Sequence, residues 1–323
     1  MKAVIVGGGF AGRVHAGALA QVGVELAAIC GRGDDLGAVL DAERPDALHV
    51  CTPNALHAEQ ALAALERGIH VVCEKPLAVS SDESARMVEA AASRGLVGAT
   101  CYHVRGYPLV EHMRTAVGAG DLGDLRFVHG RYLCDDVLRP GGGWRLLPEA
   151  SGLSYVVADL GTHWLDVAEH VTGLRVLEVL AQLRGEPLED YAALLLRLDG
   201  GVRGSLLLSA GAAGRKNQLL FECEGSRGGL TWDQEHPDEL LHRQADAPTS
   251  IVLKDAATSR LARFPAGHGE GYGEAFANVF LNVYRAIAGV EHDSFPTFED
   301  GHRGVRAVEA AVASAHSGDW VEV

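Results

Sequence analysis

Residues 2–12 read Lys-Ala-Val-Ile-Val-Gly-Gly-Gly-Phe-Ala-Gly, a short apolar run that leads into a glycine-rich turn and then a helix-like stretch. A Gly-x-Gly-x-x-Gly pattern in this position is typical of the turn that binds the pyrophosphate of a dinucleotide. The first glycine permits the tight turn, the second lets the pyrophosphate approach the backbone, and the third allows helix and strand to pack closely. The alternative is a glycine-rich turn in an unrelated α/β domain. The expected cofactor contacts are Gly7, Gly9, Phe10, Ala11 and Gly12.

From Lys2 to about Ala99, short apolar runs alternate with helical stretches, which predicts a doubly wound parallel sheet covered on both faces. After about Asp121, strand-like runs follow one another with short Gly/Asp turns, which predicts antiparallel pairing in an α+β domain. We therefore expect an α/β protein with a Rossmann dinucleotide-binding domain at 1–120 and an α+β substrate and oligomerisation domain at 121–323. The last helix is expected to pack back on the Rossmann domain.

The chain has 323 residues, 47% hydrophobic and 22% charged, with a formal net charge of -15. That charge counts against nucleic acid or an anionic membrane as the main partner. The six cysteines form no CxxC pair, so we expect reduced thiols. The sequence shows neither a signal-peptide pattern nor an apolar stretch long enough to span a membrane, which predicts a cytoplasmic protein.

The segment Ile29-Cys30-Gly31-Arg32 lies about twenty residues beyond the glycine motif, where NAD-preferring folds place an Asp or Glu on the ribose hydroxyls. That acid is missing. Arg32 would suit the 2′-phosphate of NADP, so NADP is favoured over NAD. The alternative is a solvated Arg32 with Asp34 or Asp35 as the ribose ligand.

Two further motifs carry candidate chemistry. Glu74-Lys75-Pro76 follows the strand-like run 70–73, and a lysine at the carboxyl end of a strand is placed to hydrogen-bond a substrate hydroxyl. Asp159 and His163 are spaced to share one helix face, and histidine is a natural acceptor for a hydroxyl proton. The structural alternatives are a surface salt bridge at Lys75 and a helix-capping Asp159 with a core histidine.

These three motifs, in this order and spacing, resemble the glucose-fructose oxidoreductase and inositol 2-dehydrogenase (Gfo/Idh/MocA) family over essentially the whole chain. The resemblance implies an open, mostly antiparallel second sheet, catalytic roles for Lys75, Asp159 and His163, and a homo-oligomer, dimer or tetramer. It also implies that the loop near the nicotinamide ribose and the acid before the lysine contact the cofactor. Those residues are Thr52, Pro53, Asn54, His57 and Glu74, and Lys75 itself is also expected to contact the cofactor.

Six residues are weaker candidates for substrate contacts: His103, Arg105, Tyr107, Trp144, Arg145 and Tyr272. His103 departs from the Asn that family members usually carry there. We expect His15 to pack or cap on the first helix, and His49 to lie in a strand pattern with no partner at metal-ligand spacing. No set of His, Cys and acidic residues has metal-ligand spacing along the chain, so no metal is expected.

The sequence therefore predicts reversible oxidation of a secondary alcohol in a sugar, glycoside or cyclitol by NAD(P), the proton passing to His163 or Lys75. One alternative is a glycosidase or epimerase that retains its NAD and oxidises the sugar only transiently. Another is a non-catalytic NAD(P)-binding regulator.

Overall fold

The computed structural model describes residues 1–139 and 143–323. The described chain forms two compact units. The first comprises 1–103, 149–152 and 272–305, and the second comprises 104–148, 153–271 and 306–323. The units are thus interleaved along the chain and differ from the continuous segments 1–120 and 121–323 expected from the sequence, because the polypeptide returns to the first unit near its C-terminal end.

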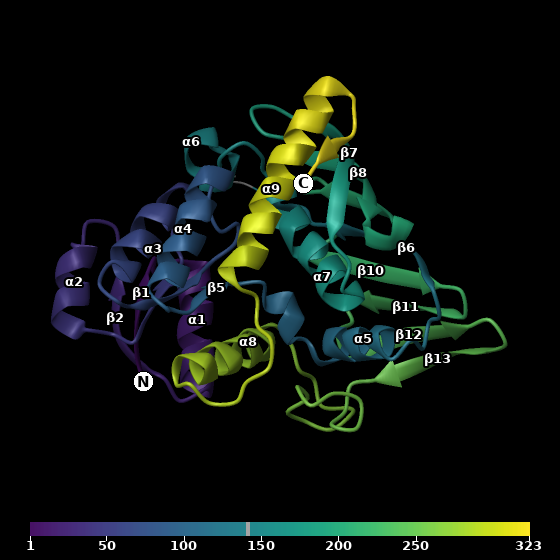
Figure 1. The fold of residues 1–323 in the computed structure, drawn as a ribbon, viewed down its shortest axis with the longest axis horizontal. Helices are drawn as coiled ribbons and strands as arrows, with labels where there is room; N and C mark the ends of the chain where they lie inside the picture. The colour runs from purple at the N-terminus through teal and green to yellow at the C-terminus, as the bar shows by residue number, and fades with distance from the viewer. Residues whose placement is uncertain (140–142) are drawn as a thin grey trace. The chain divides into compact units, whose positions relative to one another are not determined.

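The first unit is built on a five-stranded sheet in which every pairing is parallel (Figure 1). Its strand order is β2-β1-β3-β4-β5. The strands are β1 (Lys2–Val6), β2 (Glu25–Cys30), β3 (Ala47–Val50), β4 (His70–Cys73) and β5 (Gly98–Thr100). The order reverses between β1 and β3, and sheets of this type bind ligands at the carboxyl edge beside such a switch point.

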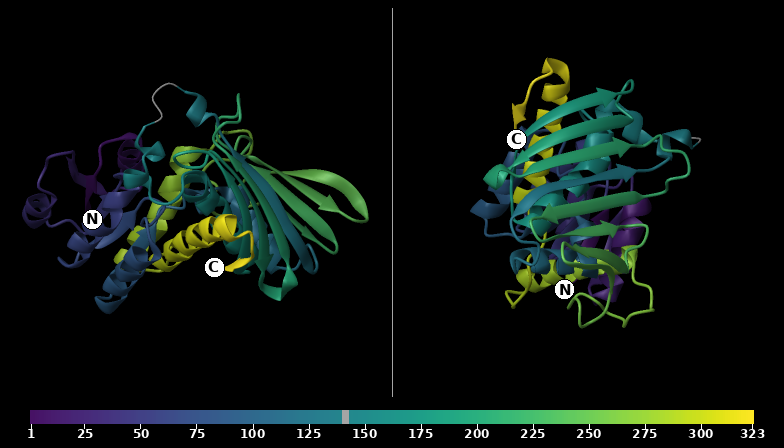
Figure 2. Two further views of the ribbon diagram at one scale, coloured as in Figure 1. Left: turned by 90° about the horizontal axis from the view of Figure 1, so that it is seen from above. Right: turned by 90° about the vertical axis from the view of Figure 1, so that its right-hand side faces the viewer.

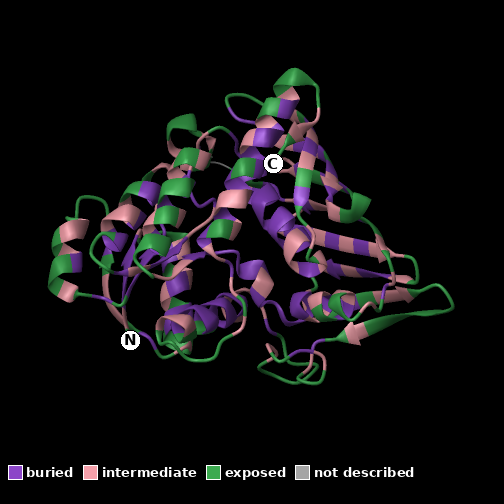
Figure 3. Ribbon diagram, viewed as in Figure 1, coloured by how far each residue is buried: buried purple, intermediate pink, exposed green. Residues whose placement is uncertain are grey.

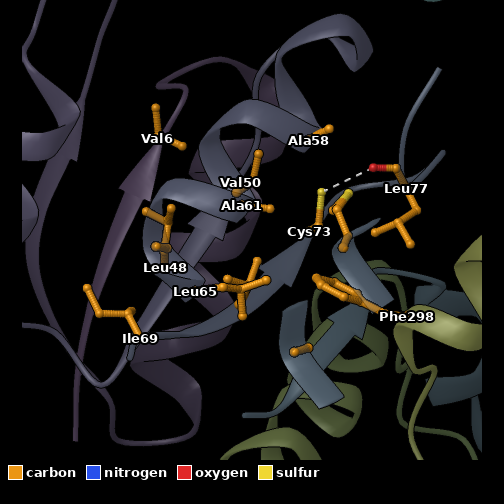
Figure 4. Close-up of a cluster of buried hydrophobic side chains, with 14 of the residues drawn as sticks. Val6, Leu48, Val50, Ala58, Ala61, Leu65, Ile69, Cys73, Leu77 and Phe298 are labelled. Carbon is orange, nitrogen blue, oxygen red and sulfur yellow. Dashed lines mark hydrogen bonds between the residues drawn. The ribbon is translucent and has the colours of Figure 1, made fainter. Parts of the chain in front are cut away.

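Alternating side chains of the sheet enter two separate hydrophobic cores, because successive residues of a strand point to opposite faces. Val4 and Val6 join the core under α2 (Leu36–Glu43), α3 (His57–Leu65) and α4 (Ser81–Ser93). Figure 4 shows this cluster, with Phe298 packed against it. Ala3 and Ile5 join the opposite core under α1 (Phe10–Gln21) and α8 (Tyr272–Ile287). The predicted double covering is confirmed.

Part of that covering comes from the far end of the chain. α8 lies entirely in the first unit and contributes the buried rings Phe276, Phe280 and Tyr284. α9 (Phe298–Ser317) contributes its first turns to the same unit, whereas its residues from Arg306 onward belong to the second.

The second unit is built on a nine-stranded sheet, in the order β13-β12-β11-β10-β6-β9-β8-β7-β14. Its pairings are antiparallel except for β6 with β9, so the sheet is mostly antiparallel as expected. The strands are β6 (Leu125–Leu133), β7 (Val176–Arg184), β8 (Tyr191–Leu198), β9 (Arg203–Ser209), β10 (Gln218–Gly225), β11 (Gly228–Asp233), β12 (Glu239–Gln244), β13 (Ala247–Leu253) and β14 (Val321–Glu322).

Helices α5 (Pro108–Gly118) and α7 (Thr162–Thr172) pack on one face of this sheet, and α6 (Pro148–Ser151) is a single turn. Burial alternates along β8 and β9. Figure 3 shows buried and more exposed residues following one another along strands of this sheet. The other face has no helix in front of it in the right-hand view of Figure 2. It carries the exposed side chains of Leu195 and Leu207.

All six cysteines are free and buried, as expected for reduced thiols. Among the helices of the described residues, none is long and apolar enough to cross a membrane. A cytoplasmic location stays a prediction from the sequence.

Candidate functional site

The glycine turn between β1 and α1 has the geometry of a pyrophosphate cradle. Gly7 has a φ of +100°, and a Cβ added there would lie 2.4 Å from the carbonyl oxygen of Cys51. A Cβ at Gly12 would lie 2.0 Å from the carbonyl oxygen of Gly7. A Cβ at Gly9, by contrast, would meet nothing within 4 Å. The first and third glycines are therefore required by the protein's own packing, whereas the second faces open space beside the N-terminus of α1, where an anion is favoured.

In this fold type the segment after β2 contacts the adenosine ribose of a bound dinucleotide. Asp34 accepts a hydrogen bond from the Gly31 N–H at 2.7 Å, and Asp35 caps α2 by accepting from the Ala38 N–H at 3.0 Å. Arg32 is exposed and forms no ion pair within the described residues. Both acids are thus engaged by the backbone.

The loop after β3 is held from behind by His57. Its Nε2 lies 2.9 Å from the carbonyl oxygen of Thr52, and its Nδ1 lies 2.8 Å from the carbonyl oxygen of Pro76. Burial lowers the pKa of this ring. Both nitrogens of His57 face backbone carbonyls, so this residue braces the loop against the Glu74-Lys75-Pro76 segment. Its contact with the cofactor stays a prediction.

The rest of this loop is also fixed by the protein. The Thr52 hydroxyl donates to Gln60 Oε1 at 2.7 Å, and the buried Asn54 amide donates to the carbonyl oxygen of Ser151 at 3.2 Å. Pro53 stands at the start of the short 3-10 helix 54–56. The backbone at Thr52 therefore has a rigid position beside Gly7.

Glu74 and Lys75 directly follow β4, at the carboxyl edge of the sheet. Glu74 Oε1 lies 3.1 Å from His15 Nε2, and its Oε2 accepts from the Lys75 N–H at 3.1 Å. Burial alone would raise the pKa of Glu74, but the hydrogen bond and charge of His15, with Lys75 and His103, lower it to about 2. The carboxylate is ionised at neutral pH.

An aromatic cluster borders the glycine turn within the same unit. The His103 ring stacks on Phe276 with centroids 4.6 Å apart, and it meets the edge of Tyr272, also at 4.6 Å. Tyr272 begins α8 and lies 6.1 Å from Phe10, which is 64% exposed at the start of α1. Burial holds the pKa of His103 at about 3, so the ring is neutral.

Asp159 and His163 lie in the second unit, across the junction of a π-helical turn, 157–161, and α7. The wider turn means that the pair does not follow the regular helical spacing assumed from the sequence. Such turns are frequent at functional sites. His163 is buried with its ring centroid 6.2 Å from that of Tyr132.

A buried carboxylate anchors the start of this turn. Glu189 Oε1 accepts hydrogen bonds from the backbone N–H groups of Tyr155 and Val157 and from the Ser154 hydroxyl. Sequence reasoning missed Glu189, which is 35 residues from Ser154 along the chain.

Arg145 forms an ion pair with Asp159. Its Nε lies 3.4 Å from Asp159 Oδ1, and its guanidinium lies 4.8 Å from the centre of the Trp144 ring. Arg145 and Asp159 have 45% and 17% exposed side chains, so the pair remains accessible. Burial, followed by the charge of Asp159, raises the pKa values of Tyr132 and Tyr155, which therefore stay protonated and able to donate.

Two residues expected to contact the substrate have partners within the protein, and their contact with a substrate stays a prediction. Arg105 binds Asp166 through two hydrogen bonds, of 2.8 and 2.5 Å, in a largely buried ion pair. Tyr107 is buried, with its ring 5.1 Å from Trp232. Both residues tie α5 to its surroundings.

His15 packs in the core on α1, as expected, but the partners of His49 were not foreseen. The Nδ1 atoms of His15 and His49 lie 2.9 Å apart, and His49 Nε2 lies 2.9 Å from the Tyr284 hydroxyl. The fold also gathers His15, Glu74 and Cys101, whose potential ligand atoms lie within 4.8 Å of one another, and likewise His129, Glu222 and Glu224. Spacing along the chain could not reveal these clusters, because each joins residues from separate parts of the chain.

Comparisons with known proteins match both parts of the chain. A model described as an oxidoreductase family with an NAD-binding Rossmann fold matches residues 32–102, and one for the GFO/IDH/MocA C-terminal domain matches residues 110–231. An uncharacterized oxidoreductase of Bacillus subtilis, YfiI, is 30% identical, with 87% of this chain and 79% of the relative covered. Levoglucosan dehydrogenase of Pseudarthrobacter phenanthrenivorans is 27% identical, with 99% and 97% covered.

Two solved structures resemble this chain over its whole length. A levoglucosan dehydrogenase complex with NADH and levoglucosan has a TM-score of 0.93 at 26% identity, covering 100% of this chain and 99% of that one. An inositol dehydrogenase homolog of Azotobacter vinelandii, complexed with NADH and myo-inositol, has a TM-score of 0.89 at 28% identity, covering 100% and 97%.

Proposed function

Because this chain belongs to the Gfo/Idh/MocA family of oxidoreductases, we propose that it oxidises a secondary alcohol of a sugar, glycoside or cyclitol, or reduces the corresponding ketone, with a nicotinamide dinucleotide. The observation that carries the proposal is the glycine turn, where Gly7 and Gly12 leave no room for a Cβ while Gly9 faces open space. The substrate class is supported by relatives that act on levoglucosan and by a homolog complexed with myo-inositol.

Oxidation of an alcohol removes a hydride from carbon and a proton from oxygen. The dinucleotide, when bound, accepts or supplies the hydride. In this proposal Lys75 Nζ orients the substrate oxygen and His163 takes its proton, with Asp159 gripping a neighbouring hydroxyl. Arg145 next to Asp159, and the adjacent Trp144 ring, suit a polyol because a forked donor and an aromatic face both bind sugars.

We propose that the protein prefers NADP to NAD as its cofactor. The exposed Arg32 has no ion-pair partner in the described part of the chain, and both nearby acids are held by backbone N–H groups. A guanidinium so placed suits a 2′-phosphate.

We also propose a homo-oligomer formed through the open face of the second sheet. Leu195 and Leu207 are 51% and 37% exposed on adjacent strands of that face. Exposed apolar patches of this kind mark protein interfaces.

The test is the near-ultraviolet absorbance of reduced nicotinamide, followed with a panel of sugars, glycosides and inositols and with NAD and NADP supplied separately. Lys75→Ala and His163→Ala should abolish turnover while dinucleotide binding persists. The control is the exposed His236, whose replacement by Ala should change neither. Wild-type turnover in either variant would remove that residue from the mechanism. Sugar conversion without net cofactor reduction would instead indicate the retained-NAD chemistry.

A further inference from the structure

A continuous chain of hydrogen bonds runs through the first unit from Glu74 to Tyr284. Glu74 Oε1 lies 3.1 Å from His15 Nε2, His15 Nδ1 lies 2.9 Å from His49 Nδ1, and His49 Nε2 lies 2.9 Å from the Tyr284 hydroxyl. The four residues come from the segment after β4, from α1, from β3 and from α8. Four separate elements thus contribute to one chain of contacts that ends at the Glu74 carboxylate.

Each contact of the chain needs one donor and one acceptor. His15 Nε2 faces a carboxylate and therefore donates to Glu74. When His49 Nδ1 donates to His15 Nδ1, His49 Nε2 is left to accept the hydroxyl proton of Tyr284. In that arrangement all three hydrogen bonds point from the tyrosine hydroxyl towards Glu74.

The surroundings of this chain are apolar, which makes its polar contacts strong. His15 and His49 are both fully buried, and the Phe280 ring lies 4.9 Å from each of them. Burial, with the nearby His15, lowers the pKa of His49 well below its ordinary value, so this ring stays neutral. At the sheet edge the ionised Glu74 is held by His15 Nε2 on one oxygen and the Lys75 N–H on the other.

The position of Glu74 along the sheet decides which half of a dinucleotide it faces. In this fold type the adenosine ribose is read after β2 and the pyrophosphate lies at the N-terminus of α1. The nicotinamide half must therefore extend to the opposite side of β1, over the carboxyl ends of β3 and β4. Glu74 directly follows β4.

We propose that the His15–His49–Tyr284 chain fixes Glu74 as an oriented anion that makes the protein bind the positively charged, oxidised nicotinamide more tightly than the neutral, reduced one. His15, His49 and Tyr284 are positioning residues, since they act through Glu74. The inference rests on the proposed dinucleotide function and extends it, because it assigns a preference between the two redox states of the cofactor.

The test measures separate dissociation constants for the oxidised and reduced cofactor, without substrate, by calorimetry. Glu74→Gln keeps the shape of the side chain but removes its charge, so it should weaken the oxidised form by about tenfold relative to the reduced form. Tyr284→Phe and His15→Gln should shift the ratio of the two dissociation constants in the same direction. Each variant breaks one contact of the chain that ends at Glu74.

The matched control is the hydrogen bond between Ser84 Oγ and His302 Nδ1, 2.8 Å long and in the same unit. Its loss in His302→Gln should leave the ratio unchanged. A ratio that stays at the wild-type value in Glu74→Gln and Tyr284→Phe, or equal weakening of both redox forms, would overturn the inference.

The same titration separates the two proposals. If the wild type turns over a polyol but the variants keep its ratio of dissociation constants, the proposed function stands and this inference is refuted. If the wild type binds neither form of the cofactor, the proposed function and this inference are both refuted.

Discussion

Glu189 Oε1 accepts a hydrogen bond from the backbone N–H of Tyr155 at 2.9 Å, which joins the loop before β8 to the start of the π-helical turn. The same oxygen lies 3.2 Å from the Val157 nitrogen. Since the turn carries Asp159, a carboxylate outside the turn sets the position of a proposed substrate residue.

Replacement of Glu189 by Ala should therefore lower kcat by about tenfold or more, because small displacements of positioned groups are costly in catalysis. The dissociation constant of the cofactor should not change, since Glu189 belongs to the second unit. Steady-state kinetics and cofactor titration check this. The exposed Glu186→Ala is the control, and equal kcat values for both variants would contradict the prediction.

The glycine turn allows stability and cofactor affinity to be separated. Gly7→Ala should destabilise the protein by about 2 kcal/mol or more, because of the clash with Cys51 and the positive φ. Gly9→Ala should leave the melting temperature nearly unchanged yet weaken cofactor binding, because its Cβ enters open space. Thermal unfolding and calorimetric titration of the two variants provide the comparison. Full affinity in Gly9→Ala would mean that no pyrophosphate approaches this backbone.

Arg32→Asp should shift cofactor preference from NADP towards NAD, because it exchanges a phosphate ligand for a ribose ligand. The measurement is kcat/KM with each cofactor. Arg44→Asp, at another arginine of the same unit, serves as the control for the change in charge. An unaltered NADP-to-NAD ratio in Arg32→Asp would leave the 2′-phosphate interpretation without support.

Acid should destabilise the protein through His103. Burial lowers the pKa of its ring from 6.5 to about 3, against the opposing charge of Glu74. Below pH 6.5 the unfolded chain takes up a proton that the folded protein does not, so the unfolding free energy is greatest above that pH and falls as the pH drops towards about 3. Chemical unfolding at several pH values should show a shallower loss in His103→Asn than in the wild type. Parallel curves would exclude His103 as a source of acid sensitivity.

Leu195→Asp on the open sheet face should convert the proposed oligomer into monomers, because a charge cannot be buried there without a partner. Light scattering coupled to size exclusion gives the mass directly. Leu177→Asp, at another exposed leucine, should matter less if the interface centres on β8 and β9. A wild-type protein that is already monomeric would refute the assembly.

Local patterns account for most of the fold that could be predicted. The run Lys2–Gly12 specifies strand, turn and helix within a few residues. The parallel and mostly antiparallel sheets followed from the order and spacing of apolar runs. These features depend on neighbours in sequence, which a single chain displays.

Long-range contacts were beyond such reasoning. His49 and Tyr284 are 235 residues apart, and nothing in either local pattern points to the other. Asp166 and Trp232, the partners of Arg105 and Tyr107, lie far along the chain from them, so the sequence alone could not reveal these contacts. The π-helical turn at Asp159 was hidden because it depends on its anchor at Glu189.

The late return of α8 to the first unit has a consequence for synthesis of the protein on the ribosome. Ala3, Ile5 and Leu19 are translated early, yet Phe276 and Phe280, which share their core, emerge only near the end of the chain. One face of the first sheet is therefore only partly covered while most of the second unit is made. A nascent chain stalled before residue 272 would expose that apolar face, the kind of surface that chaperones bind.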